Sequence, residues 1–259
     1  MSGTDELCMT YGPVAGRAEL VRLIAAAGGL TLHESAELPA GESKSEYLSP
    51  SGTPLLKHGD LKLSQSGAIE AYLASIAPKF SGLTPQQRAI DSMYAGIKEE
   101  MLSNCAKALF TTKNGEDVTK LLDERWFPLM EASIPAEGFI NGLAFPTVAD
   151  LVVLNIKTGY SACPFASTVV ASRAHIPTAP HPPCRLAVRC PQSALSVPSV
   201  RTGTSFAVPF GAAMKLAGYD ATLVKYPKVK ALADRTAGAL GPEAFPTKFT
   251  NANPFKDGR

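Results

Sequence analysis

Tyr11 stands where a phenol could take part in chemistry. It ends the short apolar stretch "ELCMTY" (6–11), and after a loop the segment "GRAE" opens a helix with Arg17 in its first turn. A tyrosine in such a place either fills the core or turns its hydroxyl toward the start of the helix. The rest of the chain has to distinguish between these two interpretations.

Cysteines and histidines are the other candidates for chemistry. Cys8 lies inside the stretch that ends at Tyr11, which favours a buried structural thiol over a reactive one. A second group lies far along the chain, and its spacings match no compact zinc pattern, so we expect no metal site. This group consists of Cys163, His175, His181, Cys184 and Cys190.

Length and composition exclude several classes of protein. With 259 residues, 45% of them hydrophobic, the chain can bury a substantial core in one or two domains. A formal net charge of +2 gives no reason to expect a nucleic acid or an anionic membrane as partner. We find no secretory signal in "MSGTDEL" and no apolar run long enough to span a membrane. Five cysteines at irregular spacing favour a reduced, cytoplasmic protein.

The first part of the chain alternates strands and helices. A strand at 6–11 is followed by a helix from 17 to 27, which Gly28-Gly29 should end, and by a strand at 30–38. A hairpin at 54–65 turns at Gly59-Asp60 and leads into a helix at 66–77. The resulting βαβ-ββα order predicts an α/β thioredoxin-like domain with a mixed sheet over residues 1–78.

The second part, residues 84–259, is predicted to be an all-α domain. Thr84 and Gln87 form a capping box for a helix from about 85 to 110. Further helices are expected at 116–131, 145–160 and 226–238, and the one at 145–160 has Thr147 as N-cap and Asp150 in its first turn. Thr147 and Asp150 are therefore assigned a structural role.

One segment of the helical domain has no helical pattern. Residues 166–210 are irregular and rich in Pro, Ser and Ala, which indicates disorder or poor packing. Similar tetrapeptides, "ACPF" and "AVPF", stand at its two ends. We interpret the segment as a retained intron or another gene-model error, with a genuine insertion as the alternative.

Taken together, the motifs resemble those of glutathione S-transferases, and the tyrosine-type sigma class is the most similar. The resemblance rests on Tyr11 before "GRAE", on "TPLL" at 53–56, on "LSQSGAIEAYLA" at 63–74 and on "PTVADL" at 146–151. It covers residues 5–160 and 211–245. A thioredoxin-like redox protein would instead need a Cys-x-x-Cys pair at 11–14, which is absent.

The resemblance implies a role for each matching residue. Tyr11 corresponds to the hydroxyl that stabilises the glutathione thiolate, and Arg17 to an arginine beside it. Thr53, before a cis Pro54, corresponds to the residue whose backbone pairs with the glutathione cysteine. Gln65 and Ser66 correspond to the binding site of the γ-glutamyl carboxylate at a helix N-terminus.

Two departures from the sigma pattern stand out. Leu38 occupies the place of the family's tryptophan, and the lysine that holds the glycine carboxylate falls on Glu42 without a gap or on Lys44 with one. We assign Lys44 to glutathione binding. The acidic residue that relatives lend to the neighbouring subunit falls on Ala95, with Asp91 one turn earlier.

The resemblance therefore implies a cytoplasmic, homodimeric enzyme that uses glutathione as co-substrate and conjugates it to hydrophobic electrophiles. The electrophile pocket should draw on the loop at 12–16, the helix near 98–108 and the C-terminal tail. A non-catalytic, crystallin-like member of the family and a glutathione-dependent prostaglandin-type isomerase are the alternatives. Retention of Tyr11, Gln65 and Ser66 favours the enzyme.

Overall fold

The computed structural model describes residues 6–12, 16–50, 52–107, 119–161 and 219–241. The irregular segment at 166–210 and the Cys/His group from 163 to 190 lie outside these ranges. In the described ranges, no group of His, Cys, Asp and Glu side chains could hold a metal ion. No helix in the same ranges is long and apolar enough to cross a membrane.

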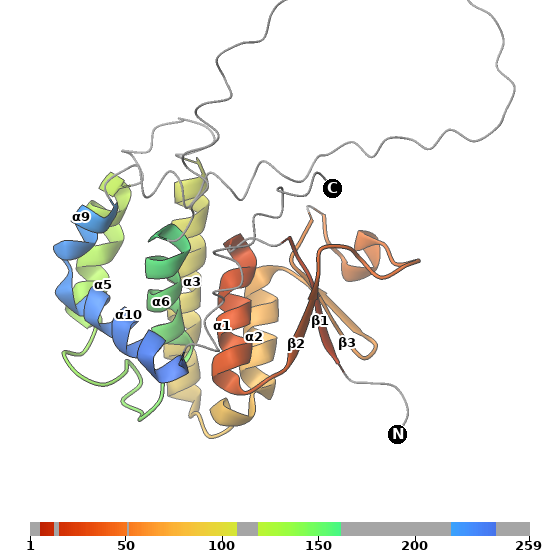
Figure 1. Ribbon diagram of the computed structural model, residues 1–259, viewed down its shortest axis with the longest axis horizontal. Coiled ribbons are helices and arrows are strands. Elements are labelled where there is room, and N and C mark those ends of the chain that lie inside the picture. The colour runs from red at the N-terminus through yellow and green to blue at the C-terminus, as the bar shows by residue number, and fades with distance from the viewer. Residues whose placement is uncertain (1–5, 13–15, 51, 108–118, 162–218, 242–259) are drawn as a thin grey trace, which may run out of the picture.

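A four-stranded mixed sheet forms one side of the molecule, with strand order β2-β1-β3-β4 (Figure 1). Strand β1 pairs in parallel with β2 and antiparallel with β3, and β4 pairs antiparallel with β3. This arrangement confirms the mixed sheet predicted from the βαβ-ββα order. The strands are β1 (Leu7–Thr10), β2 (Leu32–Ser35), β3 (Leu55–His58) and β4 (Leu61–Ser64).

Helix α1 (Glu19–Gly28) lies between the sheet and the helical part of the chain (Figure 1). It is covered on both sides, which is why nearly all of its residues are buried, including the charged Glu19 and Arg22. The helix ends where the sequence predicted, at Gly29, whose φ of 79° is the left-handed conformation that glycine adopts at least cost. Helix α2 (Ser66–Ile76) packs beside α1.

The remaining described elements are helical and pack around α6, which contacts α1, α3 and α10. The capping box at the start of α3 is confirmed, because the Gln87 side chain accepts the Thr84 N–H at 3.0 Å and the Thr84 hydroxyl accepts the Gln87 N–H at 3.2 Å. These helices are α3 (Pro85–Lys107), α5 (Phe127–Ser133), α6 (Val148–Ser161), α9 (Tyr219–Val224) and α10 (Pro227–Leu240).

One helix prediction needs correction in detail, and one helix was not predicted. The helix expected at 116–131 is helical where described, but residues 119–121 lead into a π-helical turn at Leu122–Trp126 before the chain continues as α5. Because Pro128 has no N–H to donate, the α-helical hydrogen-bond pattern is interrupted there, and the helix changes to the wider π form just before it. Helix α9 was not predicted, because its six residues are too few to show a helical period.

The start of α6 is fixed by a buried polar network. Asp150 accepts the backbone N–H of Thr147 at 2.9 Å, one half of the expected capping box. The Thr147 hydroxyl, however, donates to Asp91 of α3 at 2.7 Å, and Asp91 also accepts the Ala149 N–H at 2.9 Å. Asp91 therefore serves as a structural link between α3 and α6.

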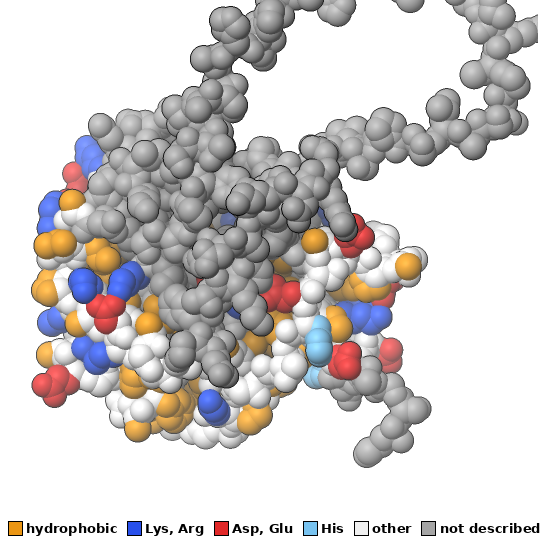
Figure 2. All heavy atoms as spheres, in the orientation of Figure 1, with side chains coloured by type: hydrophobic (Ala, Val, Ile, Leu, Met, Phe, Trp, Pro, Cys, Tyr) orange, Lys and Arg blue, Asp and Glu red, His pale blue; other side chains and the backbone are white. Residues whose placement is uncertain are grey.

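Charges of both signs are interspersed on the surface. On the face in Figure 2, Lys and Arg side chains lie among Asp and Glu side chains toward the left and right of the view, and hydrophobic side chains predominate at the bottom. This distribution fits the formal net charge of +2. It offers no single-sign patch on the visible part of that face.

Candidate functional site

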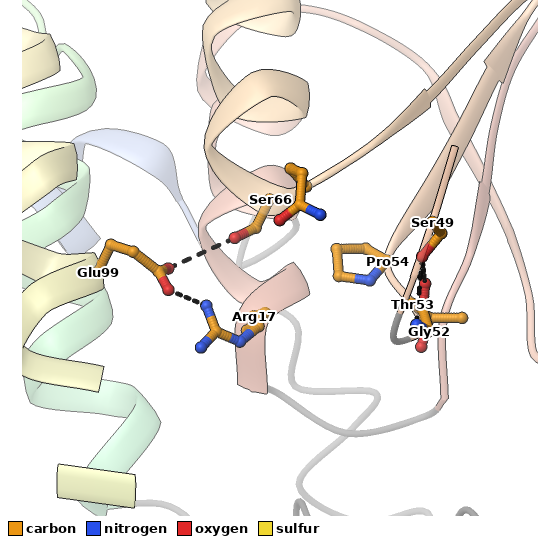
Figure 3. A pocket seen from close by; sticks show the side chains of 8 residues that line it. Arg17, Ser49, Gly52, Thr53, Pro54, Ser66 and Glu99 are labelled. Atoms are coloured by element: carbon orange, nitrogen blue, oxygen red, sulfur yellow. Dashed lines mark hydrogen bonds and ion pairs between the residues drawn. The ribbon is translucent and has the colours of Figure 1, made fainter. Parts of the chain in front are cut away.

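A cavity of about 240 Å³ opens between the sheet side of the molecule and α3 (Figure 3). Three separate segments of the N-terminal half supply most of its walls, and α3 closes the far side. The segments are the turn before α1, the loop before β3 and the first residues of α2. The lining residues are Arg17, Ser49, Gly52, Thr53, Pro54, Gln65, Ser66 and Glu99.

Five of the residues singled out in the sequence thus come together around one cavity. They come from three segments that are far apart in the chain, and the strand–helix connections place them at the same edge of the sheet. The peptide bond between Thr53 and Pro54 is cis, as predicted. These residues are Arg17, Thr53, Pro54, Gln65 and Ser66.

Tyr11 lies next to the cavity, although it is not among the lining residues. Its hydroxyl accepts the backbone N–H of Arg17 at 3.1 Å. Gly16 makes this approach possible, since a Cβ at that position would overlap the Tyr11 hydroxyl and its φ of +44° suits glycine. No acceptor among the described residues takes the proton of the Tyr11 hydroxyl.

The surroundings of Tyr11 keep its hydroxyl protonated. Burial raises the pKa of the phenol, and the Arg17 N–H together with the nearby Arg22 and Arg17 side chains opposes this rise. The Arg22 guanidinium lies 5.7 Å from the centre of the Tyr11 ring. It is held there by Glu34, which accepts from it at 2.8 Å. The phenol is therefore a neutral hydrogen-bond donor at physiological pH.

Arg17 and Glu99 form an ion pair across the cavity (Figure 3). The Ser66 hydroxyl, at the start of α2, lies 3.5 Å from the other oxygen of the same carboxylate. The side chains of Arg17 and Glu99 are 41% and 39% exposed, so the pair contributes little to stability. The cavity thus presents a cation, an anion and a helix N-terminus to any ligand.

Gln65 has an unusual backbone conformation for its residue type. Its φ is 69° and its ψ is 115°, and it directly precedes the first residue of α2. A non-glycine residue in such a region carries strain that the surrounding structure must offset, and this kind of strain concentrates at functional sites. This conformation places Gln65 on the cavity wall, next to the first N–H groups of α2, which have no partner within the helix.

Lys44, the residue assigned to the glycine carboxylate, is exposed in a short 3-10 helix (Lys44–Tyr47) and does not line the cavity. Glu42, the alternative in register, accepts from Lys57 at 2.7 Å and from Tyr47. These bonds lower the pKa of Glu42 to about 2, so it is a carboxylate engaged elsewhere. The role of Lys44 stays a prediction.

Sequence reasoning missed three lining residues, Ser49, Gly52 and Glu99, and Glu99 is the charged one among them. The region near 98–108 was expected to contribute to an electrophile pocket, but no acidic residue in it was assigned a role. Its signal in the sequence is weak, because "KEE" at 98–100 in an otherwise mixed helix resembles an ordinary solvated face. Only the packing of α3 against α2 shows that Glu99, and not Glu100, reaches the cavity.

Comparison with known proteins gives a structural match only. No family model matches the sequence, and no curated protein matches it. A Pi-class glutathione S-transferase from Onchocerca volvulus has a similar structure, at 13% sequence identity over 89% of this chain and 87% of that chain, with a TM-score of 0.52. NaGST-2 is also similar, at 19% identity over 91% of this chain and 93% of that chain, with a TM-score of 0.51.

The chain has the glutathione S-transferase fold. Its thioredoxin-like sheet domain and its helical part correspond to the fold class predicted from the sequence. At these levels of identity the likeness concerns the fold alone.

Proposed function

We propose that this chain is a glutathione transferase of the tyrosine type, similar to the sigma class, in which Tyr11 stabilises the glutathione thiolate. The observation that carries the proposal is the state of the Tyr11 hydroxyl. It accepts the Arg17 N–H, it stays protonated because burial raises its pKa, and its proton has no acceptor in the described part of the chain. The hydroxyl can therefore donate to an anion beside the cavity.

The chemistry follows from this donor. A free thiol has a pKa of about 8.5, so little thiolate exists at neutral pH. A hydrogen bond from the Tyr11 hydroxyl favours the charged form and lowers that pKa. The thiolate then attacks an electrophilic carbon, a C–S bond forms, and the leaving group departs with its electron pair. Tyr11 keeps its own proton throughout.

The rest of glutathione fits the charges of the cavity. The backbone of Thr53 lies in the wall and is available for β-type pairing with the peptide. Gln65, Ser66 and the N-terminus of α2 favour the γ-glutamyl carboxylate. Glu99 offers an anion for the γ-glutamyl ammonium, and Arg17 offers a cation for a carboxylate. The ion pair between Arg17 and Glu99 can thus give way to two new ion pairs when glutathione binds, one between Glu99 and the ligand ammonium and one between Arg17 and a ligand carboxylate.

Binding and turnover of the whole chain test this proposal. The chain should be retained on immobilised glutathione and should conjugate glutathione to a chloro-dinitrobenzene acceptor, with chloride as leaving group. Retention without turnover on a panel of acceptors would favour the non-catalytic alternative. A folded protein that does not bind glutathione, as judged by circular dichroism and calorimetry, would contradict the proposal.

Two observations favour the non-catalytic alternative. Leu38 replaces the family's tryptophan, and Lys44 lies away from the lining residues. The described part of the wall therefore offers the glycine carboxylate no cation besides Arg17. Weak glutathione binding is compatible with a transferase, whereas the absence of turnover is not.

A homodimer is also part of the proposal. Helices α2 and α3 pack against each other and expose small or apolar residues to solvent, among them Ala68, Ala71, Gly96 and the 55% exposed Met93. Such a surface can bury apolar area against a second copy. Light scattering coupled to gel filtration measures the assembly directly, and a monomer at micromolar concentration would contradict this point.

A further inference from the structure

A buried ion pair lies behind the cavity and has no role in the proposed chemistry so far. Lys98 of α3 donates to Glu70 of α2 at 2.5 Å, and each side chain is 2% exposed. Glu70 stands one helical turn after Ser66, and Lys98 directly precedes Glu99. Both partners are thus neighbours, along their helices, of residues that line the cavity.

Stability alone does not explain this pair. Removing two charges from water costs several kcal/mol, and their mutual attraction often fails to offset that cost. The second carboxylate oxygen of Glu70, Oε2, is buried without a hydrogen-bond partner among the described residues. Replacing a buried ion pair by apolar side chains of similar size is often neutral or stabilising. A buried pair that is only half satisfied points to another role.

The pair is linked to the cavity through Glu99. The Lys98 ammonium lies 3.9 Å from Oε2 of Glu99, the same oxygen that faces the Ser66 hydroxyl at 3.5 Å. The other oxygen of Glu99 is bound by Arg17. Negative and positive charges therefore alternate from Glu70 through Lys98 and Glu99 to Arg17, whose backbone N–H donates to the Tyr11 hydroxyl.

We propose that Lys98, held in place by Glu70, is a positioning residue that fixes the Glu99 carboxylate toward Ser66 and so preorganises the cavity for the zwitterionic end of glutathione. This inference rests on the proposed function. Glu70 holds the Lys98 ammonium at 2.5 Å, and in this position Lys98 lies 3.9 Å from Glu99, where its charge orients the carboxylate without occupying it in place of a ligand ammonium. Without Glu70, Lys98 turns to Glu99 and competes with that ligand.

The arrangement gives ligand affinity a pH dependence. The groups that face Glu70 are Lys98 and Glu99 from α3 and Arg17 from the turn before α1. Burial raises the pKa of Glu70 to about 7, against the opposing effect of Lys98. Below that pH, Glu70 is neutral and no longer holds Lys98. We expect the affinity for glutathione to fall between pH 8 and pH 6.

The test compares wild type with the double variant Glu70→Leu/Lys98→Met, which exchanges the ion pair for an apolar pair of similar size. The probe is S-methylglutathione, which has no ionisable thiol, titrated by calorimetry at pH 6 and pH 8. Glu100→Gln is the matched control, because Glu100 lies on the same helix and pairs with Arg125 at the surface. At pH 8 we expect the double variant to bind S-methylglutathione at least tenfold more weakly than wild type does. The affinity of the double variant should be the same at pH 6 as at pH 8.

Kinetics separate positioning from a general loss of structure. In the double variant the KM for glutathione should rise, while kcat at saturation stays within about threefold because Tyr11 is intact. Glu100→Gln should match wild type in both constants. A double variant that is folded and binds within twofold of wild type at pH 8 overturns the inference.

A second variant keeps the test decisive if the double variant does not fold. Glu70→Gln retains the shape of the side chain, and at pH 8 it should bind S-methylglutathione as weakly as wild type does at pH 6. Retention of the wild-type pH dependence in Glu70→Gln overturns the inference. If wild type itself does not bind S-methylglutathione, the proposed function fails and this inference fails with it.

Discussion

The backbone N–H of Arg17 donates a 3.1 Å hydrogen bond to the hydroxyl of Tyr11. This bond fixes the phenol oxygen at the edge of the cavity while the phenol proton stays available to a ligand. The side chain of the same arginine binds Glu99 across the cavity. One residue thus connects the proposed thiolate donor to the charges that would hold the rest of glutathione.

Replacing Tyr11 by Phe should slow conjugation without abolishing binding. We expect a rate at least tenfold lower with the chloro-dinitrobenzene acceptor, about 1.4 kcal/mol in the barrier, and glutathione affinity within about twofold of wild type. Because burial raises the pKa of Tyr11 and keeps the phenol protonated, its hydrogen bond lowers the thiol pKa, and the wild-type rate should level off at a lower pH than the Tyr11→Phe rate does. Tyr226→Phe, which removes a hydroxyl that binds Asp123, is the control. An unchanged rate in Tyr11→Phe would exclude the donor role.

Replacing Gly16 by Ala should displace the Tyr11 hydroxyl. The new Cβ would overlap that hydroxyl, and the φ of +44° is strained for alanine. We expect a loss of about 1–3 kcal/mol in unfolding free energy and a fall in kcat. Gly238→Ala is the control, since it lies in α10 with nothing near its added Cβ. Equal urea midpoints for the two variants would contradict the proposed close approach.

Replacing Glu99 by Gln should weaken glutathione binding, because the γ-glutamyl ammonium loses its anion. We expect the dissociation constant measured by calorimetry to rise about tenfold, or about 1.4 kcal/mol. The neighbouring variant Glu100→Gln also removes a carboxylate paired with an arginine, but outside the cavity. If both variants bind alike, Glu99 has no special role.

Replacing Thr147 by Ala should destabilise the fold and spare the chemistry. Thr147 is fully buried, and its hydroxyl donates to Asp91 at 2.7 Å. Removing this donor should cost about 1–3 kcal/mol in unfolding free energy, measured by urea denaturation. The activity per folded molecule should remain that of wild type. A cost below about 0.5 kcal/mol would mean that Asp91 is satisfied without Thr147.

Replacing Glu70 by Gln should change how stability depends on pH. Burial raises the pKa of Glu70 from 4.5 to about 7, so between these values the folded protein retains a proton that the unfolded chain has lost. The contribution of this group to stability is therefore present below pH 4.5 and is lost as the pH rises through 7.

Between pH 4.5 and pH 8, wild type should therefore lose about 3 kcal/mol of unfolding free energy relative to Glu70→Gln. This figure takes about 1.4 kcal/mol for each unit by which the pKa of Glu70 is raised. Urea midpoints at four pH values measure it. Glu46→Gln is the control, because Glu46 lies near the surface with a lowered pKa. A difference that does not vary with pH would show that Glu70 is ionised throughout this range.

Local features of the fold could be predicted from the sequence because their causes lie within a few residues. Gly29 ends α1, Thr84 and Gln87 cap α3, and a hairpin joins β3 to β4. Each depends on backbone conformation or on contacts between near neighbours in the chain. The same locality explains why Tyr11 could be placed at the end of β1, directly before the turn into α1.

Contacts between distant residues were decided by the tertiary structure alone. Glu99 reaches Arg17, Lys98 reaches Glu70, and Asp91 reaches Thr147 only because α3 packs against α2 and α6 at a particular rotation. No sequence spacing encodes that rotation, since it results from the shapes of many buried side chains together. The sequence by itself determined which segments carry the donors and the helix N-terminus. The packing of α3 determined which charges meet them.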